Sequence, residues 1–105
     1  MKLNIIIGEN SSPIEVPVDM LDDAEAIFSK MDKEMDKGGQ MYRDWVDDLN
    51  QQQRCQIIAN RLLTAIENEN EPTSMLMAGY IMSRMPGIAN VEISTDGDIT
   101  QTQLT

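Results

Sequence analysis

The sequence predicts an α+β fold, organised as a single acidic domain over residues 1–105. Three observations favour this class. Alternating apolar residues open the chain, longer segments with apolar residues three and four positions apart fill its middle, and an Asp-Gly turn lies between two alternating segments near its end. We therefore expect about four helices, two of them forming a long antiparallel hairpin, and a small sheet.

The N-terminal part supplies the first expected strands. Residues 2–8 alternate between apolar and polar side chains and predict a strand. Residues 9–13 have the composition of a turn, and residues 14–18 alternate again. Because Pro17 cannot donate a backbone hydrogen bond to a neighbour, we expect residues 14–18 to form a short edge strand or to lead into the next helix.

The C-terminal part predicts a β-hairpin. Residues 91–94 and 99–104 flank the Asp96-Gly97 turn, which is a strong short-range hairpin signal. An isolated hairpin is only marginally stable in water, so it must pair with another strand. The strand at residues 2–8 is the expected partner, and the sheet would then join both ends of the chain.

Two helices are expected before position 50. Residues 19–37 carry an apolar stripe at helical spacing, with Asp19 as the capping residue and Gly38-Gly39 as the stop. Residues 40–49 also show apolar residues at three- and four-residue spacing and predict a second, shorter helix.

Two longer helices should follow and form the antiparallel hairpin. Asn50 is a suitable cap for a helix over residues 51–68, and Pro72 suits the first turn of a helix that ends near Met85. Pro86-Gly87 stops this fourth helix. It has apolar residues in almost every direction, which indicates burial on more than one side.

The net charge of −10 limits the possible partners. Such a chain repels nucleic acid and anionic membrane surfaces, so we expect neither as a direct partner. Between positions 19 and 48, ten acidic residues stand against only four basic ones. This imbalance motivates one alternative function, in which the protein is a decoy of nucleic acid that binds a basic protein partner.

Few residues offer reactive chemistry. The chain contains no histidine, which is the most frequent general base and metal ligand. Its one cysteine, Cys55, falls on the apolar stripe of a predicted helix, as a buried and unreactive thiol would. Asp96-Gly97-Asp98 lacks the further acidic ligands of a calcium loop and is typical of a turn. We therefore expect no catalytic residue, no cofactor and no metal.

Four methionines lie within residues 75–85, MLMAGYIMSRM. Thioethers can bind Cu(I), but no histidine or second cysteine joins them, so core filling is the default interpretation. Burial against a second copy of the chain is the alternative, and two aromatic residues at 42 and 45 form another group of a kind enriched in protein interfaces. The candidate interface residues are Met75, Met77, Ala78, Gly79, Tyr80, Met82, Met85, Tyr42 and Trp45.

Taken together, these features favour a non-enzymatic protein-interaction or regulatory module that self-associates as a homodimer through the fourth helix. Besides the acidic decoy, the remaining alternative is a small-ligand binder or an enzyme that uses carboxylates alone. That alternative requires a deep pocket lined by converging acidic residues. Because no apolar segment has the length of a signal peptide core or of a membrane span, we expect a cytoplasmic protein.

Overall fold

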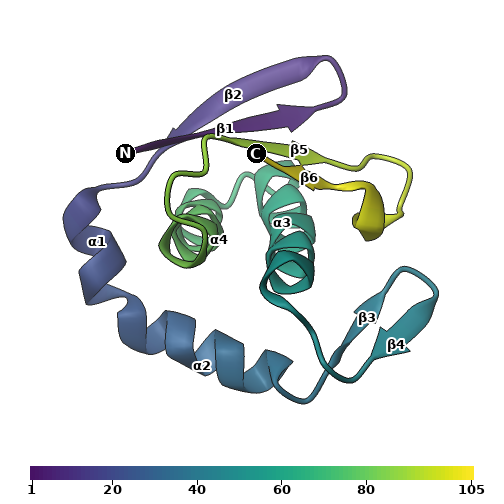
Figure 1. Cartoon of the computed structure of the whole chain (residues 1–105). Coiled ribbons are helices and arrows are strands. Elements are labelled where there is room, and N and C mark those ends of the chain that lie inside the picture. Colours follow the sequence, from purple (N-terminus) through teal and green to yellow (C-terminus); the bar gives the residue numbers. More distant parts are fainter.

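The computed structural model describes the whole chain, Met1–Thr105, and confirms the α+β class. In chain order the elements are β1 (Lys2–Ile7), β2 (Asn10–Glu15), α1 (Val18–Asp23), α2 (Glu25–Met35), β3 (Gly39–Met41), β4 (Asp44–Val46), α3 (Gln51–Glu67), α4 (Glu71–Arg84), β5 (Asn90–Ile93), a 3-10 turn η1 (Ile99–Gln101) and β6 (Gln103–Leu104). Figure 1 shows three layers, with the sheet on one side, α3 and α4 in the middle, and α1 and α2 on the other side.

The main sheet joins both ends of the chain, as the sequence predicts. Its strand order is β2-β1-β5-β6, with β1 antiparallel to β2 and parallel to β5, and β5 antiparallel to β6. Alternate residues of the two central strands are buried and face the helical layer: Leu3 and Ile5 of β1, and Val91 and Ile93 of β5. The other face of the sheet carries the intervening, more polar residues.

Strand β2 begins earlier than the sequence predicts. Residues 9–13 were expected to form a turn, but the turn is confined to Gly8, at φ 60°, and Glu9. Pairing starts immediately afterwards, with Asn10 opposite Ile7. The expected bounds of 14–18 are therefore wrong, since β2 ends at Glu15. The expected edge position of this strand is correct, and Pro17 leads into α1. The long overlap with β1 outweighs the turn composition of this segment.

The free edge of β2 lacks a hydrogen-bond donor at its centre. Met1 and Val16 exchange both backbone bonds, with the Val16 N–H donating to the Met1 oxygen at 2.7 Å and the Met1 amino group donating to the Val16 oxygen at 3.0 Å. Antiparallel pairs alternate, so Pro13 falls at a position whose backbone faces away from β1. Pro13, rather than Pro17, thus protects the edge strand from pairing with another chain.

The helix predicted over residues 19–37 is divided at Ala24 into α1 and α2. Ala24 has φ −92° and ψ 3°, yet its N–H still donates to the Met20 oxygen, and the Phe28 N–H donates to the Ala24 oxygen. The division is therefore a change of direction with little loss of hydrogen bonding. It allows both Met20 and Phe28 to reach the same point on α4, at Gly79.

The helix predicted over residues 40–49 is wrong, because β3 and β4 form a two-stranded hairpin there. Gly38, at φ 96°, ends the preceding segment, and its missing side chain is required: a Cβ atom would lie 2.6 Å from the Val46 oxygen. Met41 and Leu49 are buried, as a helical stripe would be, whereas Tyr42 and Trp45 are exposed. The four-residue spacing of this short segment was therefore misleading.

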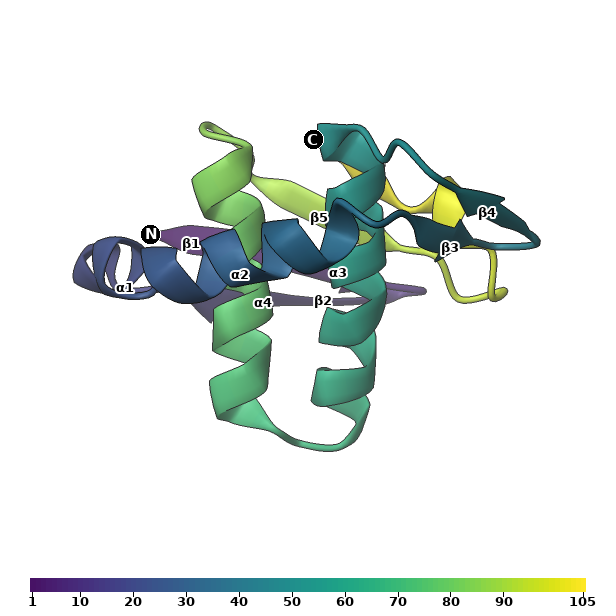
Figure 2. The ribbon, with the colours of Figure 1, turned by 90° about the horizontal axis from the view of Figure 1, so that it is seen from below.

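Helices α3 and α4 begin where the sequence predicts, to within one residue. At Asn50 the side chain accepts the Gln53 N–H at 2.8 Å, and the Gln53 side chain accepts the Asn50 N–H at 2.9 Å, which completes a capping box. Asn70 caps α4 ahead of Pro72. Figure 2 shows the two helices side by side, crossing the strands and joined at one end by residues 68–70. No helix is long and apolar enough to span a membrane.

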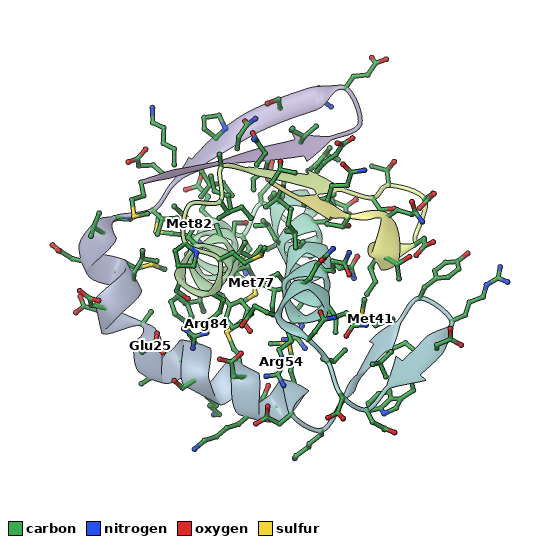
Figure 3. All side chains as sticks on the ribbon, viewed as in Figure 1. Glu25, Met41, Arg54, Met77, Met82 and Arg84 are labelled. Carbon is green, nitrogen blue, oxygen red and sulfur yellow. The ribbon has the colours of Figure 1, made fainter.

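The all-round apolar character of α4 reflects its position between two layers of the same chain. It packs against the sheet side on one flank and against α1 and α2 on the other (Figure 1). The candidate interface residues that are buried here are Met77, Ala78, Gly79, Tyr80 and Met82. Met75 and Met85 are partly buried against the same core. This methionine-rich helix therefore fills the monomer core, and Met77 and Met82 can be located there in Figure 3.

We predict that Gly79→Val destabilises the protein. A Cβ atom at position 79 would lie 3.2 Å from the Phe28 ring and 3.3 Å from the end of Met20, so a branched side chain overpacks this contact. The expected decrease in the free energy of unfolding is about 1–3 kcal/mol, measured by urea denaturation. Gly79→Ala should cost clearly less, because its better helix propensity offsets a small shift of Met20. Equal costs for both variants would contradict this explanation.

Candidate protein-interaction site

Most of the charged groups beneath α2 belong to an ion-pair network. The Arg84 guanidinium donates to both Glu25 carboxylate oxygens, at 2.9 and 3.0 Å, and its Nε donates to Asp32 at 2.9 Å. The Tyr80 hydroxyl donates a short hydrogen bond to the other Asp32 oxygen. Arg84 also lies over the Phe28 and Tyr80 rings. The Arg84 guanidinium is thus satisfied by hydrogen bonds and ion pairs at its N–H groups and by contact of its plane with aromatic rings.

Arg54 holds the other end of α2 in a similar way. It donates to the backbone oxygens of Leu49 and Asp32, each at 3.1 Å, and to the Asp36 carboxylate at 2.7 Å. Figure 3 shows Arg54 and Arg84 between α2 and the pair formed by α3 and α4. Every buried side-chain nitrogen or oxygen in the protein has a hydrogen-bond partner. The network therefore connects the layers, and it leaves no unpaired carboxylate there as a general base.

The weakly acidic groups of this region are held in their neutral forms. Burial raises the pKa of the Cys55 thiol to about 11, so it is protonated at neutral pH and is a poor nucleophile. Burial and the hydrogen bond to Asp32 both raise the pKa of Tyr80. No group of three or more His, Cys, Asp or Glu side chains is placed to hold a metal ion.

Glu25→Gln tests the pH dependence of the network. Hydrogen bonding from Arg84 holds the pKa of Glu25 below its usual value of 4.5. A carboxyl group with a lower pKa in the folded state stabilises the fold when ionised, so its contribution is complete above about pH 5 and is lost as the pH falls through the folded pKa. We expect the variant to lower the free energy of unfolding at neutral pH and to have a smaller effect near pH 3. Glu34→Gln, on the same helix but without an ion pair, is the control.

The strongest surface feature is the β3–β4 hairpin, which projects from the side of the molecule (Figure 1). Trp45 is 59% exposed and Tyr42 is 44% exposed, and both lie on this element. The hairpin is fixed to the body by Met41, which is buried and lies on the side facing α3 (Figure 3). Two large aromatic side chains are therefore largely exposed on an anchored support, and their exposed parts give the monomer no hydrophobic stabilisation.

The two aromatic side chains are restrained. The Trp45 indole Nε1 donates to the Asp47 carboxylate at 3.1 Å, which limits rotation of the ring. Tyr42 forms the hairpin turn with Arg43 and has φ 55°, a backbone region that favours glycine. The Arg43 guanidinium lies 5.1 Å from the centre of the Tyr42 ring. The chain thus places a tyrosine where a glycine would be more stable.

Acidic residues surround the aromatic pair. Asp44 lies in β4, and Asp47 and Asp48 follow it directly. Arg43 is the only basic residue between positions 38 and 53. The hairpin therefore combines two exposed aromatic anchors with a local excess of negative charge, which is a composition suited to a complementary basic surface.

Of the candidate interface residues, Tyr42 and Trp45 are brought together on one exposed element, and the buried members of the fourth helix are not part of it. Sequence reasoning missed Asp47 as the partner of Trp45. The two are two positions apart, a spacing that places side chains on the same side of an extended segment but not of a helix. An accurate strand prediction would have identified the pair.

Comparisons of the chain with models of protein families, with curated proteins and with solved structures found no match.

Tyr42→Gly should make the isolated protein more stable. Glycine adopts φ 55° without the steric cost that a Cβ atom carries, so we expect the free energy of unfolding to rise by about 0.5–1 kcal/mol in urea denaturation. Tyr42→Ala removes the same ring but keeps the Cβ atom, and it should give no increase. A loss of stability in the glycine variant would show that the tyrosine ring, through Arg43, stabilises the turn instead.

Proposed function

We propose that the protein is a non-enzymatic interaction module that binds a basic protein partner through the β3–β4 hairpin. The observation that carries this proposal is the 59% exposure of Trp45 on a restrained, projecting element. In this proposal α2, together with α3 and α4 acting as an antiparallel helical hairpin, forms the rigid body that presents the site. Tyr42 and Trp45 are the anchor residues.

The anchors have the properties of residues that dominate binding energy. Tryptophan and tyrosine are enriched among such residues because each buries a large area and loses few rotatable bonds. The Trp45–Asp47 hydrogen bond restrains the indole, and the Arg43 guanidinium over the Tyr42 ring restrains the phenol before binding. A restrained side chain loses less entropy when the complex forms, and this increases affinity.

Charge favours a basic partner over a second copy of the chain. Two molecules that each carry a net charge of −10 repel each other, and the repulsion is strongest where acidic residues flank the contact. The fourth helix, on which the expected homodimer depended, is largely occupied by the core of its own chain. Self-association through this helix is therefore less well supported than binding of a basic partner.

The acidic decoy is less well supported than the hairpin site. Among the ten acidic residues between positions 19 and 48, Glu25, Asp32 and Asp36 are paired with Arg84 or Arg54. A paired carboxylate is neutralised locally and cannot take the place of a phosphate. Of the seven that form no ion pair, four lie on α1 and α2, away from the hairpin. We assign the other three, Asp44, Asp47 and Asp48, to steering and to rim contacts of a basic partner.

The experiment is a selection of random phage-displayed peptides on the immobilised protein. We expect the selected peptides to be rich in lysine and arginine and to carry apolar residues that contact the aromatic pair. Trp45 is the only tryptophan of the chain, so its fluorescence emission reports binding at the hairpin directly. Trp45→Ala should weaken the selected peptides by about tenfold or more in calorimetric titrations.

Val18→Ala is the matched control. Val18 is 58% exposed and lies on α1, at the opposite end of the molecule from the hairpin (Figure 1). Its replacement should leave peptide affinity unchanged. Selected peptides without a basic bias, or equal binding by the Trp45→Ala variant, would refute the proposal.

A further inference from the structure

A second surface feature lies on the opposite side of the α3–α4 pair from the ion-pair network. It is a cavity of about 660 Å³ between β1, β2 and the end of the helical pair. Figure 2 shows the connection between α3 and α4 reaching past the edge strand β2, so the helices overhang the sheet here. This volume is within the usual range of small-molecule sites, about 300–1,000 Å³.

The floor and the rim of this cleft differ in chemistry. The apolar floor consists of Ile5 and Ile7 from β1, Ile14 from β2 and Ile66 from α3. The only charged residues that line it are Glu69 and Glu71, and neither forms an ion pair. The cleft thus offers apolar contact beside two unneutralised carboxylates.

Two of the four uncharged polar residues that line the cleft, Asn70 and Ser74, are already used by the fold, and the other two, Asn10 and Ser12, carry no charge. The Asn70 side chain accepts the Thr73 N–H at 3.3 Å as the cap of α4, and the Ser74 hydroxyl donates to the Asn70 backbone oxygen at 2.9 Å. The two carboxylates therefore remain the strongest free groups for a ligand. Glu71, in the first turn of α4, is also favoured by the positive end of that helix dipole.

Glu69 has no such stabilising role. It follows the end of α3 in a Schellman motif, with its N–H donating to the Ile66 oxygen at 3.0 Å and the Asn70 N–H donating to the Ala65 oxygen at 2.9 Å. The motif requires a left-handed residue, and glycine is its usual occupant, yet Glu69 stands there at φ 55°. A carboxylate is also disfavoured at the negative end of the α3 dipole. Stability alone therefore does not explain a glutamate at this position.

We propose that this cleft binds a small organic cation with an aliphatic body, such as an alkylammonium compound. The isoleucine floor would cover the aliphatic part, and Glu69 and Glu71 would neutralise the ammonium group. Charge complementarity decides the class of ligand, because the lining has two acidic residues and no basic one, on a protein with a net charge of −10. The proposal is independent of the function assigned to the hairpin.

The test compares three probes of equal length: n-octylammonium, n-octanol and octanoate. Each is titrated into the full chain, and the isoleucine methyl groups are followed by NMR. We expect saturable shifts at Ile5, Ile7, Ile14 and Ile66 with the cation, about threefold to tenfold weaker affinity for the alcohol, and no saturable shifts with the anion. Equal affinity for all three probes, or shifts scattered over the molecule, would overturn the proposal.

Two carboxylate variants and one control locate the charge effect. Glu69→Gln and Glu71→Gln should each reduce the preference for octylammonium over octanol. Glu34→Gln removes the same charge from the exposed side of α2 and should leave the preference intact. A similar loss in all three variants would show general attraction of cations to an acidic protein, and this outcome would overturn the proposal.

Glu69→Gly separates binding from folding. The glycine variant should unfold at a higher temperature, because the Schellman position favours glycine, and it should still lose the preference for the cation. Ser12→Phe provides a second check. Ser12 is exposed on β2 and lines the cleft. A phenyl ring at this position would fill the cleft and should weaken the binding of octylammonium. Trp45 emission should not change with octylammonium, so failure here and failure at the hairpin are distinguishable.

Discussion

The arrangement of the layers depends on two arginines that hold α2 against the helical pair. Arg84 reaches the start of α2 through Glu25, and Arg54 reaches its end through Asp36, while both contact Asp32 between them. Partly buried charges are costly unless each finds a partner, so the two arginines and three carboxylates must come together as a set. The position of α2 then decides that α4 is covered on two sides, and it also sets where the chain leaves toward the β3–β4 hairpin.

Local signals in the sequence were sufficient where they were mutually consistent. Asn50, Pro72 and the apolar residues that follow them predicted α3 and α4 closely, and the alternating ends of the chain predicted a shared sheet. The helix prediction for residues 40–49 failed because Met41 and Leu49 are buried by tertiary packing. Over only ten residues, their spacing resembles that of a helical stripe. The division between α1 and α2 at Ala24 could not be predicted from the local sequence either, because it depends on packing against Gly79, which belongs to a helix far along the chain.

The two sites differed in how far the sequence could predict them. Tyr42 and Trp45 were identified as anchors from composition, although the element that carries them was misassigned. The cleft was not identified, because its lining comes from two segments, residues 5–14 and 66–74, that are far apart in the sequence and meet only in the fold. The sequence contains one signal of the cleft, which is the glutamate at position 69. It follows a helix end where glycine is the usual residue, so it has a conformational cost that helix stability does not explain.

The proline at the centre of β2 has a consequence for how any partner is recognised. A protein that captures others by extending its sheet reads their backbones, and it accepts many sequences that can become extended. Here one border of the sheet lacks the donor that such docking needs, and the other border is β6, which has only two residues. A partner of this protein would therefore be recognised by side-chain chemistry, in which discrimination depends on charge, aromatic contact and shape.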